Sequence, residues 1–271
     1  MKGVAVRASR AWLMTVSALA ACVTPCEAAI GTNFSDHWFS PATPGWGIAI
    51  QQQSDTLFVQ FLVYASDGSP VWYIATATPQ APPPSLPDHS VYGGDVYRAA
   101  GPVAPNTLDT SSVTLSKVGS LSFDADSADT AKLTYMIDGA VTTKPLTRLT
   151  WKLEDLTGSY YGGFVYDFSQ THAPCVAGHF EDLGPVAITQ TGTDSLVMKV
   201  QGAARTCTFT GDYTQAGHVG TTKGIFLCTQ GGLTGTYVGS EIEKSAHGFT
   251  GRIVGETVSC MFEGRFGGVA R

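Results

Sequence analysis

Apolar and polar residues alternate along most of the chain in segments of strand length. These segments are rich in Val, Thr, Tyr and Phe and are bounded by Gly, Pro, Asn or Asp, as β-strands commonly are. No long stretch carries the apolar period of an amphipathic helix. The pattern therefore predicts an all-β protein. The expected strands are residues 47–53, 56–65, 71–75, 90–98, 111–118, 119–125, 131–138 and 141–153, then 159–168, 184–191, 195–202, 205–213, 221–228, 232–239, 248–253 and 258–266.

The turn signals between the strands predict antiparallel meanders. Ser54-Asp55 separates the first two expected strands, as the turn of a hairpin does. Residues 79–87 are rich in proline, which has no N–H to donate to a strand ladder. We expect that segment to form a surface loop.

A polar segment at residues 154–158 is the expected boundary between two modules. The first, residues 30–155, holds the Trp- and Gly-rich segments, and the second, residues 156–271, holds eight expected strands. Eight strands are enough to close a small barrel. We therefore favour two β-barrel or barrel-like modules, and one large barrel is the alternative.

The N-terminal residues 1–29 have the composition of a signal peptide. Lys2, Arg7 and Arg10 precede an apolar run at residues 11–23 that is too short to span a bilayer. We therefore expect export from a bacterial cytoplasm, with the protein periplasmic or secreted.

Two processing signals overlap in this segment. Ala28 and the residues before it suit ordinary signal peptidase, whereas residues 19–22 match a lipoprotein box that ends at Cys22. Lipidation at Cys22 would leave Cys26 unpaired beside an even set of four cysteines. Cysteine parity thus favours soluble export, and a lipid anchor in the outer membrane is the alternative.

The four cysteines beyond residue 155 are expected to form two disulfides. Three pairings are possible. A hairpin that turns at residues 215–220 would bring Cys207 close to Cys228, which leaves Cys175 to pair with Cys260. We favour that pairing.

The charge balance argues against a nucleic-acid partner. The formal net charge is −6, and charged residues make up 14% of the chain. A protein that binds nucleic acid needs a basic stripe to neutralise phosphates, and the sequence has none.

Two Trp- and Gly-rich segments carry a resemblance to known proteins. Residues 38–47 read Trp-Phe-Ser-Pro-Ala-Thr-Pro-Gly-Trp-Gly, and residues 64–73 read Tyr-Ala-Ser-Asp-Gly-Ser-Pro-Val-Trp-Tyr. With residues 96–102, 118–123 and 264–268, they resemble a family of uncharacterised exported bacterial proteins. The resemblance implies export and a β architecture. The family has no established activity, so no catalytic residue is transferred from it.

Four aromatic residues of these segments are the candidate ligand contacts. Exposed rings can stack on sugar faces or on apolar groups of a ligand. The alternative for each ring is packing in the core. The four are Trp38, Trp46, Trp72 and Tyr73.

The sequence carries no motif for a cofactor or a metal. No His-Glu-x-x-His run, phosphate loop, dinucleotide-binding glycine pattern or Gly-x-Ser-x-Gly elbow is present. His179 and Glu181 could act as base and orienter, although a solvated loop is the favoured interpretation. The acidic run at residues 124–129 lacks the Gly and Glu of a calcium loop, so we expect an acidic hairpin turn.

Together these features favour an exported, non-enzymatic binding protein whose ligand is a glycan or a small apolar molecule. The Trp and Gly clustering and the lack of catalytic motifs support this hypothesis. Two alternatives stay open. One is an extracellular polymer hydrolase or lyase that uses His179 and Glu181, and the other is an envelope-associated structural lipoprotein.

Overall fold

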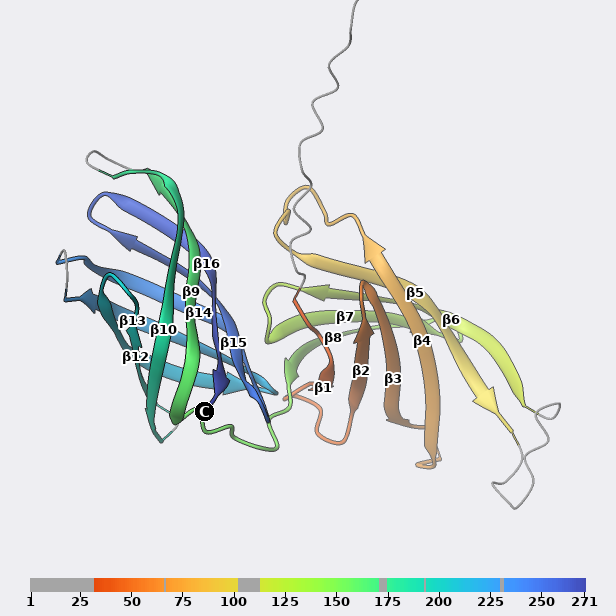
Figure 1. The fold of residues 1–271 in the computed structure, drawn as a ribbon. Helices are drawn as coiled ribbons and strands as arrows, with labels where there is room; N and C mark the ends of the chain where they lie inside the picture. The colour runs from red at the N-terminus through yellow and green to blue at the C-terminus, as the bar shows by residue number, and fades with distance from the viewer. Residues whose placement is uncertain (1–31, 66, 102–112, 171–174, 193, 230–231) are drawn as a thin grey trace, which may run out of the picture. The chain divides into compact units, whose positions relative to one another are not determined.

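Sixteen antiparallel β-strands form the described part of the chain, and they close into two barrels of eight strands each (Figure 1). The computed structural model describes residues 32–65, 67–101, 113–170, 175–192, 194–229 and 232–271. The expected signal peptide, with Cys22 and Cys26, lies outside the described residues. The predictions of an all-β fold and of two barrel modules are confirmed.

Each barrel is an up-and-down meander in which the last strand pairs with the first. Residues 149–157 join the two barrels, and the expected module boundary falls within this segment. The strands of the first barrel are β1 (Asp36–Phe39), β2 (Gly47–Gln53), β3 (Thr56–Tyr64), β4 (Pro70–Gln80), β5 (Ser90–Ala100), β6 (Thr114–Ala125), β7 (Thr130–Ile137) and β8 (Ala140–Arg148). Those of the second are β9 (Gly158–Gln170), β10 (Gly178–Thr191), β11 (Ser195–Gln201), β12 (Thr206–Ala216), β13 (Val219–Cys228), β14 (Thr234–Ser245), β15 (Gly248–Thr257) and β16 (Cys260–Ala270).

One predicted turn inside the first barrel is wrong. The sequence pattern predicts two strands, residues 111–118 and 119–125, whereas β6 runs without interruption from Thr114 to Ala125. A Cβ at Gly119 would lie 1.7 Å from the carbonyl oxygen of Met136 on β7. This glycine therefore permits a close approach of two strands and does not mark a turn.

Several strand ends differ from the prediction, and one strand was missed. β4 continues through Pro79 to Gln80, because a proline near the end of a strand removes only one ladder donor. β10 begins at Gly178, so the segment around His179 is strand and not loop. β1 was not predicted, because it has only four residues. β8 ends at Arg148 and not at residue 153.

The two cores differ in composition. In the first barrel, strands such as β3 point aliphatic and aromatic residues inward, with Leu57, Val59 and Phe61 fully buried. In the second barrel, aromatic rings stack across the interior. Phe164 lies 4.6 Å from Phe209, measured between ring centroids.

Glycines in the second barrel provide the space for these rings. A Cβ at Gly255 would lie 2.3 Å from the ring of Phe262, and one at Gly251 would lie 2.7 Å from the ring of Phe266. The interior of the second barrel is therefore filled by aromatic side chains that rest on glycine backbone.

Closure of the first barrel depends on few backbone pairs. β1 meets β8 at Trp38 opposite Arg148 and at Phe39 opposite Thr147. The Arg148 side chain supplements this short ladder. Its Nη1 lies 3.3 Å from the Asp36 carboxylate, and its guanidinium lies 4.8 Å from the centroid of the Trp38 ring.

All three nitrogens of the buried Arg148 guanidinium have partners. Nε donates to the carbonyl of Ala128, Nη2 donates to the carbonyl of Asn33, and Nη1 also reaches the carbonyl of Ser35 at 3.4 Å. The side chain thereby fastens the segment before β1 to the turn between β6 and β7. We infer that Arg148 closes the first barrel.

The Asp36 carboxylate has a second cationic partner. It accepts hydrogen bonds from the backbone N–H of His218 at 3.0 Å and from its ring Nδ1 at 2.7 Å. The bond to Asp36, followed by one to Glu243, raises the pKa of His218 to about 9. Burial alone would raise the pKa of Asp36, but the bonds from His218 outweigh it and lower that pKa.

Replacing Arg148 tests its role in closure. Arg148→Ala should lower the free energy of unfolding by about 3 kcal/mol or more, because a buried carboxylate loses a cation and three carbonyls lose their donor. Urea unfolding followed by tryptophan fluorescence measures this loss, since every described tryptophan precedes β9. As a control, Lys117→Ala breaks the exposed pair with Asp95 and should cost less than about 1 kcal/mol. Equal losses in the two variants would contradict the assignment.

The two predicted disulfides are confirmed. Cys207 pairs with Cys228, and Cys175 pairs with Cys260. They close segments with sequence separations of 21 and 85 residues, both within the second barrel.

A strong reductant should therefore destabilise the second barrel selectively. Each disulfide limits the freedom of the unfolded chain and stabilises by roughly 2 to 4 kcal/mol. We expect the thermal midpoint in far-UV circular dichroism to fall and the tryptophan fluorescence midpoint, which reports the first barrel, to move less. An unchanged dichroism melt in reductant would refute this expectation.

Candidate functional site

The candidate site lies at the open end of the second barrel, which we define as the end where β9, β11, β13 and β15 finish. A groove of about 530 Å³ lies there, and a cavity of about 20 Å³ lies inside the barrel. Phe168, Arg205 and Leu233 line both spaces, so the two adjoin. The inner cavity has room for about one water molecule.

Aromatic rings form the floor of the groove. The Phe168 ring lies 5.2 Å from that of Phe180 and 5.7 Å from that of Phe262, both edge to face. The Tyr166 ring stacks on that of Phe180 at 6.1 Å and lies 5.3 Å from that of Phe168. Because the stacked core rings fill the barrel below, a ligand body would rest on this floor and would not enter the interior.

Exposed aliphatic side chains form the rim of the groove. Val176 is 74% exposed and Val258 is 92% exposed, and both line the groove. Leu233, half-buried, lines it as well. Apolar side chains that rim a concave surface are typical of a ligand or partner site.

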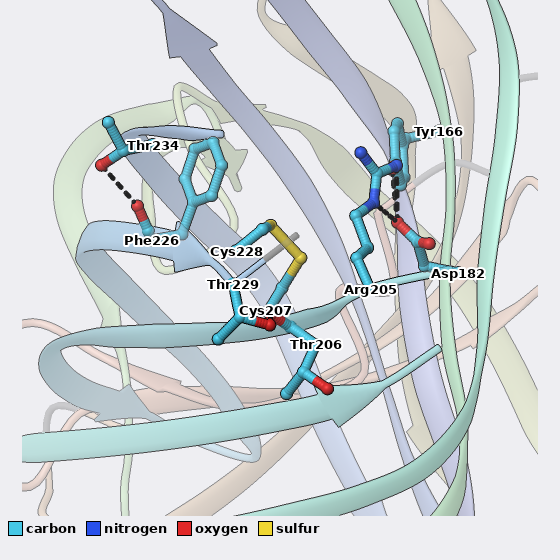
Figure 2. Close-up of a disulfide and its surroundings, with 9 residues drawn as sticks. All are labelled: Tyr166, Asp182, Arg205, Thr206, Cys207, Phe226, Cys228, Thr229 and Thr234. Atoms are coloured by element: carbon cyan, nitrogen blue, oxygen red, sulfur yellow. Dashed lines mark hydrogen bonds and ion pairs between the residues drawn. A yellow bond between two sulfur atoms is a disulfide. The ribbon is translucent and has the colours of Figure 1, made fainter. Parts of the chain in front are cut away.

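Three polar side chains meet at the boundary between groove and cavity. Figure 2 shows the Arg205 guanidinium facing the Asp182 carboxylate and the Tyr166 ring. Nε of Arg205 donates to Oδ2 of Asp182 at 2.9 Å, and Nη2 lies 2.9 Å from the same oxygen. Nη2 also donates to the Tyr166 hydroxyl at 2.5 Å, and this hydroxyl donates to Asp182 at 2.6 Å.

The Tyr166 hydroxyl stays protonated in this arrangement. Burial raises the pKa of Tyr166, and the hydrogen bond to Asp182 raises it further. A neutral phenol can therefore donate to the carboxylate at any physiological pH. The group of Arg205, Asp182 and Tyr166 carries one positive and one negative charge.

Both disulfides lie at this end of the barrel. Cys207–Cys228 joins β12 to β13 and lines the inner cavity, beside Arg205 in Figure 2. Cys175–Cys260 joins the residues before β10 to the start of β16 at the groove. The covalent links restrain the elements that present the groove.

The structure separates the four predicted aromatic ligand contacts. Trp38 is 1% exposed in the first-barrel core, where its Nε1 donates to the Phe34 carbonyl at 3.0 Å. Its ring therefore offers no surface to a ligand. Trp46 and Tyr73 are half-buried and pack against the edge of the same core.

Of these four residues, Trp72 alone presents most of its ring to solvent. It is 60% exposed on the outer face of β4, opposite Leu62 of β3. Tyr64, which is 66% exposed, lies on the same face and lines a shallow hollow of about 190 Å³ with Trp72. This outer aromatic patch is separate from the open end of the second barrel.

The candidate catalytic residues lie outside the groove and the inner cavity. His179 and Glu181 lie on β10 and both face solvent. Nδ1 of the His179 ring lies 2.9 Å from the Asp167 carboxylate, and Nε2 lies 3.7 Å from that of Glu181. The hydrogen bond to Asp167 raises the pKa of His179. At the open end, this placement gives no support to the hydrolase or lyase alternative.

The acidic run at residues 124–129 leads into the turn between β6 and β7. Asp124 bonds to His89 at 2.7 Å and pairs with Lys132 at 3.1 Å. Asp126 and Asp129 accept hydrogen bonds from hydroxyl groups of the same turn. Within the described ranges, no three metal-ligating side chains gather in a group.

Sequence reasoning missed the three polar residues of the open end. Tyr166, Asp182 and Arg205 come from β9, β10 and the segment before β12, and no motif links them. The only signal is Asp182, which belongs to the polar cluster around His179.

Comparisons with protein-family models and with curated proteins return no match. The part of the chain that the structure describes contains no helix with the length and apolar character that a membrane span requires.

Proposed function

We propose that the chain is an exported binding protein that holds a small apolar molecule at the open end of its second barrel. The observation that carries this proposal is the groove of about 530 Å³, with its aromatic floor and its exposed valine rim. Small-molecule sites have volumes of about 300 to 1,000 Å³, mostly apolar linings and a few polar groups that orient the ligand. The groove has each of these properties.

The chemistry of the lining favours binding. Both cysteine pairs at the open end are oxidised and so are not nucleophiles. Among the described lining residues, Asp182 is the sole carboxylate, and Arg205 and Tyr166 already occupy it. The rest of the groove lining is mostly apolar, with the hydroxyl side chains of Thr234, Thr257 and Ser259 among it.

The disulfides are in keeping with an oxidising compartment outside the cytoplasm. Export to the periplasm or the medium rests on the N-terminal segment of the sequence, as does the alternative of an anchor at Cys22. In such a compartment the two disulfides would stay oxidised and would keep the binding site rigid.

A second candidate function is glycan binding at the outer aromatic patch of the first barrel. The exposed rings of Tyr64 and Trp72 are the observation that favours it, because sugar faces stack on exposed aromatic rings. This site and the groove lie in different barrels, so separate substitutions distinguish them.

Binding of the neutral apolar dye N-phenyl-1-naphthylamine tests the proposal. We expect its fluorescence to rise and shift to the blue with the unchanged protein. Val258→Asp should weaken binding at least about tenfold, because a charge at the rim must be desolvated beside an apolar ligand. Val141→Asp, at an exposed valine of the first barrel, is the matched control and should bind normally.

Two results would oppose the proposal. One is equal binding by the Val258 and Val141 variants, which would place the dye elsewhere. The other is loss of binding in Trp72→Ala, which would favour the outer aromatic patch.

A further inference from the structure

Arg205 leaves one nitrogen without a partner at the open end. Nε and Nη2 are used by Asp182 and Tyr166, whereas Nη1 meets no acceptor among the described residues. Nη1 carries two N–H donors, and a half-buried guanidinium gains from a full set of acceptors. An unused donor in a lined site is a natural anchor for a ligand.

The position of Arg205 suits that role. Arg205 lines both the groove and the inner cavity. It therefore lies next to the end of a ligand whose apolar body rests on the aromatic floor. The cavity of about 20 Å³ is too small for the body of a ligand but has room for a single polar atom. A ligand oxygen that enters it would lie beside Arg205, which lines the cavity.

The charges of Asp182 and Arg205 determine which type of ligand oxygen fits beside Nη1. Asp182 already neutralises Arg205, and no other cation lines either space within the described residues. A carboxylate ligand would place a second negative charge beside a buried Asp182 without a second cation. An uncharged carbonyl would accept from Nη1 without that repulsion.

Building on the proposed function, we propose that the ligand carries an uncharged carbonyl, as a ketone, ester or amide does, and that Nη1 of Arg205 donates to it. The apolar body of the ligand rests on Phe168 and Phe180. Asp182 acts as a specificity determinant, because its charge excludes carboxylates.

Three probes that share one apolar body test this assignment: 2-acetylnaphthalene, 2-ethylnaphthalene and 2-naphthoate. Their dissociation constants are measured by displacement of N-phenyl-1-naphthylamine from the purified chain. We expect 2-acetylnaphthalene to bind about tenfold more tightly than either of the others, since it alone offers an uncharged acceptor.

Two substitutions sharpen the test. Arg205→Lys keeps a cation for Asp182 but removes Nη1, so the preference for 2-acetylnaphthalene over 2-ethylnaphthalene should disappear. Asp182→Asn leaves Arg205 uncompensated, so 2-naphthoate should become the tightest of the three probes. Asp167→Asn, at an exposed carboxylate of β9, is the control and should keep the original order.

Each contrary result has a distinct meaning. Equal affinities for 2-acetylnaphthalene and 2-ethylnaphthalene would overturn the role of Arg205 but leave the proposed function intact. Tightest binding of 2-naphthoate by the unchanged protein would overturn the preference for an uncharged group. Dye binding without displacement by any probe would overturn this inference alone. No dye binding would overturn the proposed function as well.

Discussion

Closure of an eight-stranded sheet is the constraint on which the rest of this structure depends. In the second barrel, β16 pairs with β9 along its whole length, from Cys260 opposite Gln170 to Ala270 opposite Tyr160. An eight-stranded barrel is just wide enough for its own side chains, and here aromatic rings fill it. The interior of this barrel therefore has no room for the body of a ligand. The disulfides, the rim valines and the polar group of Arg205 all lie at its open end.

The two barrels use arginine in different ways. The Arg148 guanidinium is fully buried and gives every nitrogen a protein partner, so its role is to hold β1 against β8. Arg205 is half-buried and keeps Nη1 free of partners among the described residues. A cation with all donors satisfied stabilises a fold, whereas one with spare donors beside a groove can also bind. The two arginines therefore differ in role because they differ in how many of their N–H donors have protein partners.

The sequence was sufficient for features that local patterns determine. Alternation and turn residues predicted the β class and the two barrels, and the hairpin at residues 215–220 predicted the pairing of Cys207 with Cys228. Alternation does not say which face of a strand points inward. The pattern therefore gave the same prediction for Trp38 and Trp72, although Trp38 is buried and Trp72 is exposed. The cluster of Tyr166, Asp182 and Arg205 could not be predicted, because its residues come from three segments that only barrel closure brings together.

The central claim is that the ligand binds at the open end of the second barrel. Chemical shift mapping by NMR, with the isotope-labelled chain titrated with N-phenyl-1-naphthylamine, tests it directly. We expect the largest shifts on Val176, Leu233 and Val258, which line the groove. Shifts centred on Tyr64 and Trp72, or spread evenly over both barrels, would contradict it.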